Sequence, residues 1–300
     1  MFGRRLLLAS FLALVAMPAL AQDKMPVVAT FSILGDLVKN VGGERIALTT
    51  LVGPDGDAHV YSATPADAKN LADAKVVFIN GLGYEGWMDR LVKASGTKAP
   101  LVTATRGIKT QRMAGDAHGH GHAHDEADPH AWQSAANVKI YVANIRDGLI
   151  KADPAGKTEY ESNAKAYLER LDVLAKEIRT AVGSIPKARR KVITSHDAFA
   201  YFRAAYGIDF VAPQGVSTES EASARDVARV IRQIRAQKIP AVFLENVSDP
   251  RLVRRIADET GAKIGGTLYS DALSDEKGPA GTYIDMMRHN LRQFAEALTG

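Results

Sequence analysis

The chain has 300 residues, of which 46% are hydrophobic and none is cysteine, and its formal net charge is +4. This length is enough for one large domain or two ordinary ones, each with a buried core. The lack of cysteine excludes disulfides, thiolate metal sites and cysteine nucleophiles. The sequence also lacks a basic stripe interleaved with aromatic residues, so nucleic-acid binding is not expected.

The first 21 residues have the pattern of a secretory signal peptide. Arg4 and Arg5 form a basic start, the segment 6–17 is apolar, and small residues at 19–21 precede a cleavage site that would leave Gln22 first in the mature chain. The alternative is a membrane anchor, but the apolar run is short for a bilayer, which needs about 20 residues. Because Gln22 and not cysteine follows the cleavage site, we expect no lipid attachment there. The predicted product is a soluble periplasmic protein.

Strand and helix patterns alternate through the first half of the mature chain. Three β-rich runs, each followed by a segment with helical spacing, are expected at 26–32, 45–53 and 75–81, with helices at 33–43, 64–74 and 85–95. Thr64 and Pro65 form a good helix start, because they suit the N-cap and the first helical position. This order predicts a parallel sheet with helices on both faces.

The same alternation resumes in the second half. Strands are expected at 191–195, 209–213, 241–246 and 263–270, and helices at 196–207, 223–237, 249–261 and 283–298. Asp249 is expected to cap the third of these helices. The sequence therefore predicts a second α/β unit of the same kind.

Between the two units, apolar residues recur at helical spacing for roughly seven turns of 3.6 residues, until Gly183 and Pro186. We expect a rigid strut here and not a flexible linker. The predicted architecture is two Rossmann-like α/β lobes with a cleft between them, since open α/β sheets bind ligands at the carboxyl ends of their strands. The predicted divisions are a signal peptide (1–21), an N-terminal lobe (22–153), a linking helix (154–183) and a C-terminal lobe (184–300).

Potential metal ligands lie where these strands end. His59 follows the strand at 45–53, His196 follows 191–195, Asp271 follows 263–270, and His130 lies just before a helix expected at 134–149. Three imidazoles and one carboxylate make a four-coordinate set that suits Zn²⁺. Imidazole also suits copper, iron and nickel, whereas Mg²⁺ and Ca²⁺ take oxygen ligands.

Each of these residues has an ordinary structural explanation when taken alone. His59 fits a loop residue, His196 a helix N-cap, and Asp271 a turn residue. However, only three histidines lie outside the histidine-rich stretch, and two of them are at strand ends that face one cleft. The third, His289, is expected to be solvated on the surface of the C-terminal helix.

Four further histidines precede His130 in the stretch "DAHGHGHAHDEADPHAWQS", at positions 118, 120, 122 and 124. The tract is glycine-rich and has neither helical nor strand periodicity, so we expect a mobile loop over 116–128 that binds metal weakly. Pro129 and Trp132 favour a rigid segment around His130, which we assign to the main site. The alternative for His118, His120, His122 and His124 is a solvated insert without a role.

Several segments resemble the zinc- and manganese-binding solute-binding proteins of ABC importers, the class A-I periplasmic binding proteins. The resemblance runs from Pro26 to the C-terminus and is carried by the turn 245–250 and by "FSILGDLVKNVGG", "LVGPDGDAHVYSATPAD", "ADAKVVFINGLGYEGWMDRL", "DPHAWQS", "ITSHDAFAYFRAAYG" and "LYSDAL". It implies one metal ion between two lobes, with His59, His130, His196 and Asp271 as ligands in that order.

This resemblance also implies a function. Manganese-binding members usually have Glu at the third ligand position, so His196 favours zinc, and the histidine-rich insert is typical of zinc-binding members. Some zinc-binding members lack the Asp, so Asp271 keeps manganese open. We expect a monomeric periplasmic receptor that delivers Zn²⁺ to an inner-membrane ABC permease, with a periplasmic zinc donor protein as a further partner. The alternative in this family is a manganese or iron receptor.

A zinc-dependent hydrolase is the alternative of a different class. Such enzymes keep three protein ligands and an open position for water. Here four ligands close the shell, and the HExxH pattern is absent. Glu245 is the nearest candidate for a general base, but its turn suggests helix capping. We therefore expect no enzymatic activity.

Overall fold

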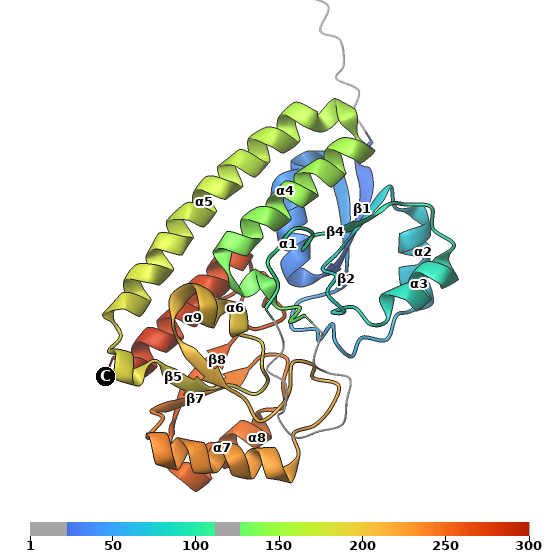
Figure 1. Ribbon diagram of the computed structural model, residues 1–300. Coiled ribbons are helices and arrows are strands. Elements are labelled where there is room, and N and C mark those ends of the chain that lie inside the picture. Colours follow the sequence, from blue (N-terminus) through green and yellow to red (C-terminus); the bar gives the residue numbers. More distant parts are fainter. Residues whose placement is uncertain (1–22, 112–126, 300) are drawn as a thin grey trace, which may run out of the picture.

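The computed structural model describes residues 23–111 and 127–299, which form two α/β lobes, each built on a four-stranded parallel sheet (Figure 1). The predicted fold class is confirmed. In the N-terminal lobe the strand order is β2-β1-β3-β4, and in the C-terminal lobe it is β6-β5-β7-β8. In each order the first strand of the lobe is internal, and because every pairing is parallel, the carboxyl ends of the four strands lie at one edge of the sheet.

The N-terminal lobe contains β1 (Met25–Phe31), α1 (Ser32–Gly42), β2 (Ile46–Val52), α2 (Pro65–Asp73), β3 (Val76–Ile79), α3 (Met88–Ser95), β4 (Leu101–Thr103) and α4 (Ala135–Ala152). The C-terminal lobe contains β5 (Lys191–Ile193), α6 (Ala200–Tyr206), β6 (Asp209–Val211), α7 (Ala224–Gln237), β7 (Ala241–Glu245), α8 (Pro250–Thr260), β8 (Lys263–Leu268) and α9 (Tyr283–Leu298). Short 3-10 turns occupy Gly43–Arg45, Ala131–Gln133, Pro154–Gly156 and Lys187–Arg189.

Local sequence signals set several helix ends. The Thr64 side chain accepts a hydrogen bond from the Asp67 backbone, the Asp67 side chain accepts one from the Thr64 backbone, and Pro65 is the first residue of α2. This is a capping box, and it satisfies backbone donors that the first turn would leave unpaired. Asp249 caps α8 as expected. Gly207 ends α6 in the left-handed region at φ 82°, which glycine adopts without strain.

Two local features differ from the sequence expectation. β4, a strand of three residues at the edge of the sheet, was not predicted. The helix expected from His196 instead begins at Ala200. The backbone at 195–197 is held out of helical geometry, because Ser195 and His196 donate to the Glu245 side chain and Asp197 donates to the Gly215 carbonyl.

The long helix α5 (Lys157–Ser184) lies along both lobes (Figure 1). It packs against α1 and α4 of the N-terminal lobe and against α6 and α9 of the C-terminal lobe. Its buried side chains lie on one face, and Glu177 on α5 forms an ion pair of 2.9 Å with Arg288 on α9. One continuous apolar core, with Trp132 and Phe294 among its members, extends through both lobes, and a smaller cluster lies beneath α7 and α8. The lobes are therefore joined by packing as well as by the chain.

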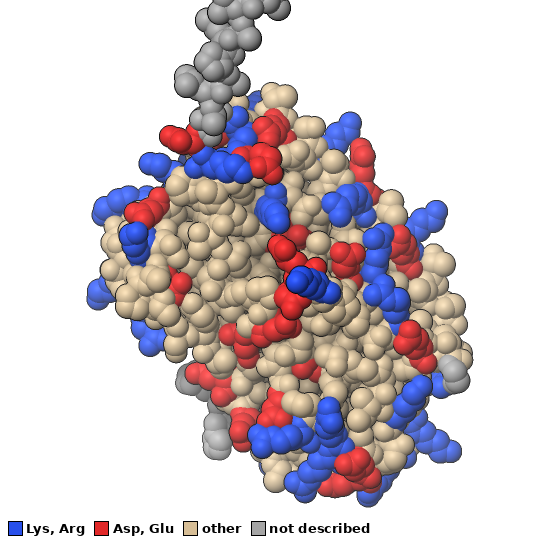
Figure 2. Space-filling view, turned by 180° about the vertical axis from the view of Figure 1, so that it is seen from behind, with Lys and Arg blue, Asp and Glu red and all other residues tan. Residues whose placement is uncertain are grey.

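On the face opposite that of Figure 1, basic and acidic side chains are interspersed (Figure 2). Among the described residues, no helix is both long enough and apolar enough to cross a membrane.

Candidate metal site

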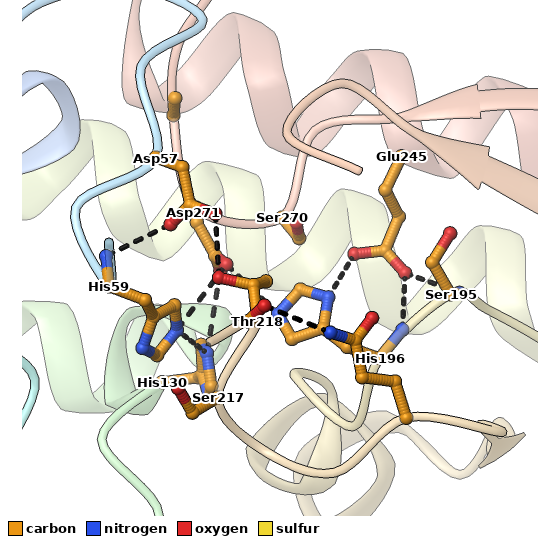
Figure 3. Close-up of polar contacts among 12 residues, drawn as sticks. Asp57, His59, His130, Ser195, His196, Ser217, Thr218, Glu245, Ser270 and Asp271 are labelled. Atoms are coloured by element: carbon orange, nitrogen blue, oxygen red, sulfur yellow. Dashed lines mark hydrogen bonds and ion pairs between the residues drawn. The ribbon is translucent and has the colours of Figure 1, made fainter. Parts of the chain in front are cut away.

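Four side chains, from four separate segments, converge between the lobes (Figure 3). His59 lies in the loop between β2 and α2, His130 lies just before α4, His196 follows β5, and Asp271 follows β8. Each offers one potential ligand atom, and these atoms all lie within 4.8 Å of one another. The structure thus brings together the four residues that were singled out in the sequence, two from each lobe.

The Nε2 atoms of the three imidazoles face the Asp271 carboxylate. His196 Nε2 lies 2.9 Å from Oδ2, His130 Nε2 lies 3.5 Å from Oδ1, and His59 Nε2 lies 3.7 Å from Oδ2. His59 Nε2 and His130 Nε2 are 3.2 Å apart. All these contacts are shorter than 4 Å, so one small ion placed among the atoms would be within reach of every ligand.

The environment of these atoms fits a cation. The side chains of His130, His196 and Asp271 are completely buried, and that of His59 is 5% exposed. Among the described residues, both Asp271 carboxylate oxygens and both His196 ring nitrogens are buried without a hydrogen bond of good geometry. Buried polar atoms normally have partners. A divalent cation would supply one to Asp271 and to His196 Nε2, and the N₃O donor set is one that Zn²⁺ uses.

The charges of the site are strongly coupled. Burial alone would raise the pKa of Asp271, but His196, His130 and His59 together outweigh it and hold this pKa well below its usual range. Burial would lower the pKa of His196, yet the carboxylates of Glu245 and Asp271 raise it well above its usual value. Burial lowers the pKa of His59 to about 3. Without a metal, Asp271 is therefore ionised and His59 is neutral, whereas His196 holds a second ring proton that it must release when a metal binds to Nε2.

His130 is held by the segment that precedes it. Oδ1 of Asp128 accepts hydrogen bonds of 2.8 Å from both the backbone N–H and the Nδ1 of His130. The Asp128 carbonyl accepts from the Tyr201 hydroxyl in the other lobe, and Asn80 donates to the Pro129 carbonyl. These bonds direct Nε2 of His130 toward Asp271.

The His59 loop is held by contacts of the two residues before His59 and of its ring. The Trp87 indole donates to the Ala58 carbonyl over 2.8 Å, and the His59 backbone donates to Asp57 Oδ1. The ring of Tyr84 packs edge-on against His59 at 4.7 Å. Asp57 Oδ2 also accepts a hydrogen bond of 2.6 Å from Thr218 in the opposite lobe, so this loop bridges the lobes.

His196 is supported by Glu245, the last residue of β7. Oε1 of Glu245 accepts from the backbone N–H groups of Ser195 (2.6 Å) and His196 (3.1 Å), and Oε2 lies 2.7 Å from His196 Nδ1. The expectation that Glu245 belongs to a helix-capping turn was wrong, because the α8 cap is Asp249 and Glu245 is 3% exposed. The sequence signal that could have indicated this role is an acidic residue at the end of a buried apolar strand.

Asp271 is placed by contacts that cross from the N-terminal lobe. The Trp132 indole and the Gln133 amide both donate to the Ser270 carbonyl over 2.8 Å. Two residues further on, the backbone of Leu273 donates to Ser32 Oγ and accepts from the Asp55 backbone. The loop that carries Asp271, which belongs to the C-terminal lobe, is thus fixed against the N-terminal lobe.

The other histidines lie elsewhere. His289 was expected to be solvated, but it is partly buried: Nε2 lies 2.9 Å from the Thr267 carbonyl, and the ring packs against Tyr269. The α9 face that carries it packs on β8, which the helical pattern alone did not indicate. His118, His120, His122 and His124 lie outside the described residues.

Comparison with known proteins identifies similar chains along almost the whole length. Residues 27–297 match the family model described as zinc-uptake complex component A, periplasmic (ZnuA). The manganese-binding lipoprotein MntA of Halalkalibacterium halodurans is 35% identical over 92% of this chain and 89% of its own length. The iron-binding protein YfeA of Yersinia pestis is 33% identical over 96% of this chain and 93% of its own.

Solved structures agree with the fold. The periplasmic zinc-binding protein TroA from Treponema pallidum superimposes with a TM-score of 0.85 at 33% sequence identity, covering 92% of this chain and 99% of that protein. By their names, these relatives bind manganese, iron and zinc respectively, so similarity alone leaves the metal open.

Proposed function

Since the chain belongs to the ZnuA family, whose members are metal-binding receptors of ABC importers, we propose that it is a receptor for Zn²⁺. It binds one ion tightly through His59, His130, His196 and Asp271 and presents it to a permease of the inner membrane. The observation that carries this proposal is the convergence of three Nε2 atoms and one buried carboxylate within 4.8 Å. Members of this family work with a membrane permease and its ATPase.

The choice of zinc rests on the donor set. Three of the four ligands are imidazoles, and carboxylate-rich sites suit manganese better. Burial keeps His59 neutral, so its Nε2 is available as a nitrogen donor, and nitrogen donors suit the borderline-soft Zn²⁺ better than the hard Mn²⁺. Manganese or iron remains the alternative, as the names of the relatives indicate.

We expect Zn²⁺ to bind more tightly than Mn²⁺ in direct competition, because nitrogen-rich sites follow the Irving–Williams order, in which Mn²⁺ comes first and weakest. The measurement is a titration of untagged, metal-free protein with each ion in the presence of the other. Elemental analysis of protein purified from the periplasm without added metal is the second arm, since cellular supply also decides occupancy. Equal or tighter binding of Mn²⁺, or manganese in the purified protein, would show that the receptor is specific for manganese and not for zinc.

We propose a binding role without catalysis. Four protein ligands would fill a tetrahedral zinc shell and leave no position for an activated water. Glu245 is committed to the backbone of Ser195 and His196 and to the His196 ring, so it is not available as a general base. Zinc-dependent hydrolysis of esters or peptides that disappears in a His130→Ala variant would favour the hydrolase alternative.

We propose that a cleavable signal peptide over residues 1–21 directs export of the protein. The mature protein is then a soluble monomer in the periplasm. The relatives named above include a lipoprotein, but cysteine, the residue that carries a bacterial lipid anchor, is absent from all 300 residues. Nucleic acid is not an expected partner, since the weak net charge gives little attraction for phosphates.

We propose that His118, His120, His122 and His124 bind additional zinc weakly and transfer it to the main site. The tract takes this zinc either from solution or from a periplasmic donor protein. Chelation by such a tract costs conformational entropy, because several side chains must be brought to one ion. A preformed site does not have this cost. The attachment of the tract next to His130 would raise the local zinc concentration at the site.

Deleting residues 116–126 should leave the tight site intact and remove only the weak additional binding, because Asp128, Pro129 and His130 remain. Loading of the tight site should become slower. The measurements are a calorimetric titration for stoichiometry and a stopped-flow loading experiment, with and without a donor protein. Loss of tight binding would mean that the tract supplies ligands to the main site, whereas unchanged stoichiometry and rate would make it a solvated insert.

A further inference from the structure

The two carboxylate oxygens of Glu245 have different tasks. Oε1 accepts two backbone N–H groups, from Ser195 at 2.6 Å and from His196 at 3.1 Å, and Oε2 faces His196 Nδ1 at 2.7 Å (Figure 3). The carboxylate is buried at the end of β7 and is not among the four converging ligands. Glu245 therefore contacts both the main chain and the ring of one candidate ligand.

We propose that Glu245 is a positioning residue, which holds His196 with its proton on Nδ1 and the lone pair of Nε2 free for the metal. This inference rests on the proposed function. A neutral imidazole has one donor and one acceptor nitrogen, and the hydrogen bond at one nitrogen decides which role the other takes. Carboxylates commonly orient metal-bound histidines in this way. In sites without their ligand such bonds are often poorly aligned and tighten on binding.

Asp128 supports His130 by a different arrangement. A single oxygen, Oδ1, accepts from both the backbone N–H and the Nδ1 of His130, each over 2.8 Å. The backbone and ring donors thus share one acceptor at His130, whereas they use separate acceptors at His196. This difference predicts opposite outcomes when each carboxylate is replaced by its amide.

In Glu245→Gln only one oxygen remains as an acceptor. It must serve the backbone N–H groups of Ser195 and His196, because buried donors without a partner are costly. The new NH₂ group then faces Nδ1 of His196, which can accept this bond only if the ring proton moves to Nε2. That tautomer has no lone pair directed at the metal. In Asp128→Asn the remaining oxygen can still accept from both donors of His130, so the tautomer of that ring is kept.

The test compares three full-length proteins: the parent, Glu245→Gln and Asp128→Asn. Zinc affinity is measured by competition with a chromophoric chelator, and the protonated nitrogen of each ring is assigned by NMR of ¹⁵N-histidine-labelled protein. We expect about a 100-fold loss of affinity for Glu245→Gln and less than about a 10-fold loss for Asp128→Asn. We also expect the His196 proton on Nδ1 in the zinc-loaded parent and on Nε2 in metal-free Glu245→Gln at neutral to slightly alkaline pH.

The outcomes separate this inference from the proposed function. Parent protein that does not bind zinc through His196 would overturn the function itself. A parent that binds zinc, with a folded Glu245→Gln variant that binds equally well and keeps its proton on Nδ1, would overturn only the role of Glu245. If circular dichroism shows that Glu245→Gln is unfolded, NMR of the His196 ring in the zinc-loaded parent becomes the test. Coordination through Nδ1 of His196 would contradict the inference. An Nδ1 proton in slow exchange would support it.

Discussion

His196→Ala should weaken zinc binding by about 10²–10³-fold, since a tight protein zinc site is worth about 10–16 kcal/mol and one of four ligands supplies roughly a quarter of it. The variant also leaves the carboxylates of Glu245 and Asp271 buried without the imidazole between them. Breaking a buried ion pair on one side costs about 3–5 kcal/mol, so the metal-free variant should be less stable as well. Calorimetric titration and thermal unfolding of the metal-free protein measure these two effects.

The matched control is His289→Ala, the same substitution at a histidine outside the cluster. It removes one contact with the Thr267 carbonyl and an edge contact with Tyr269. We expect a stability loss of about 1 kcal/mol and unchanged zinc affinity. If the two variants lost affinity equally, the four-residue ligand set would be wrong, and the effect of each would reflect general destabilisation.

Much of the architecture could be predicted because the relevant signals are local. Alternating strand and helix patterns predict parallel sheets, and in such sheets the residues that follow the strands meet at one edge. His59, His196 and Asp271 were singled out by this rule, and they lie together in the structure. Capping at Thr64 and Asp249 was readable for the same reason, since each cap depends on neighbours within three residues.

Features that depend on contacts between distant segments could not be read from the sequence. Glu245 reaches Ser195 across a strand pairing, 50 residues away, and nothing in the residues around Glu245 shows which backbone groups it will satisfy. The burial of His289 depends on how α9 packs against β8.

The contacts between the lobes also determine how metal binding changes the stability of the folded protein. Asp57 is joined to Thr218, Ser270 to Trp132, and Leu273 to Ser32, so both lobes hold the ligand-bearing loops. A shared apolar core and α5 resist separation of the lobes. An ion bound to two ligands from each lobe adds a further link across the same interface, and it supplies a partner to the buried carboxylate oxygens of Asp271.

Zinc should therefore raise the melting temperature of the metal-free protein by about 8–16 °C. A ligand at 1,000 times its Kd stabilises the folded state by about 4 kcal/mol, and each kcal/mol shifts Tm by about 2–4 °C for a chain of this approximate size. The measurement is scanning calorimetry of protein stripped with a chelator, before and after zinc is restored. The control is His196→Ala at the same free zinc concentration, which should shift far less because its Kd is higher. Equal shifts in the parent and in this variant would place the stabilising zinc outside the interlobe cluster, and repeating the scan on the 116–126 deletion would then show whether the histidine-rich tract holds it.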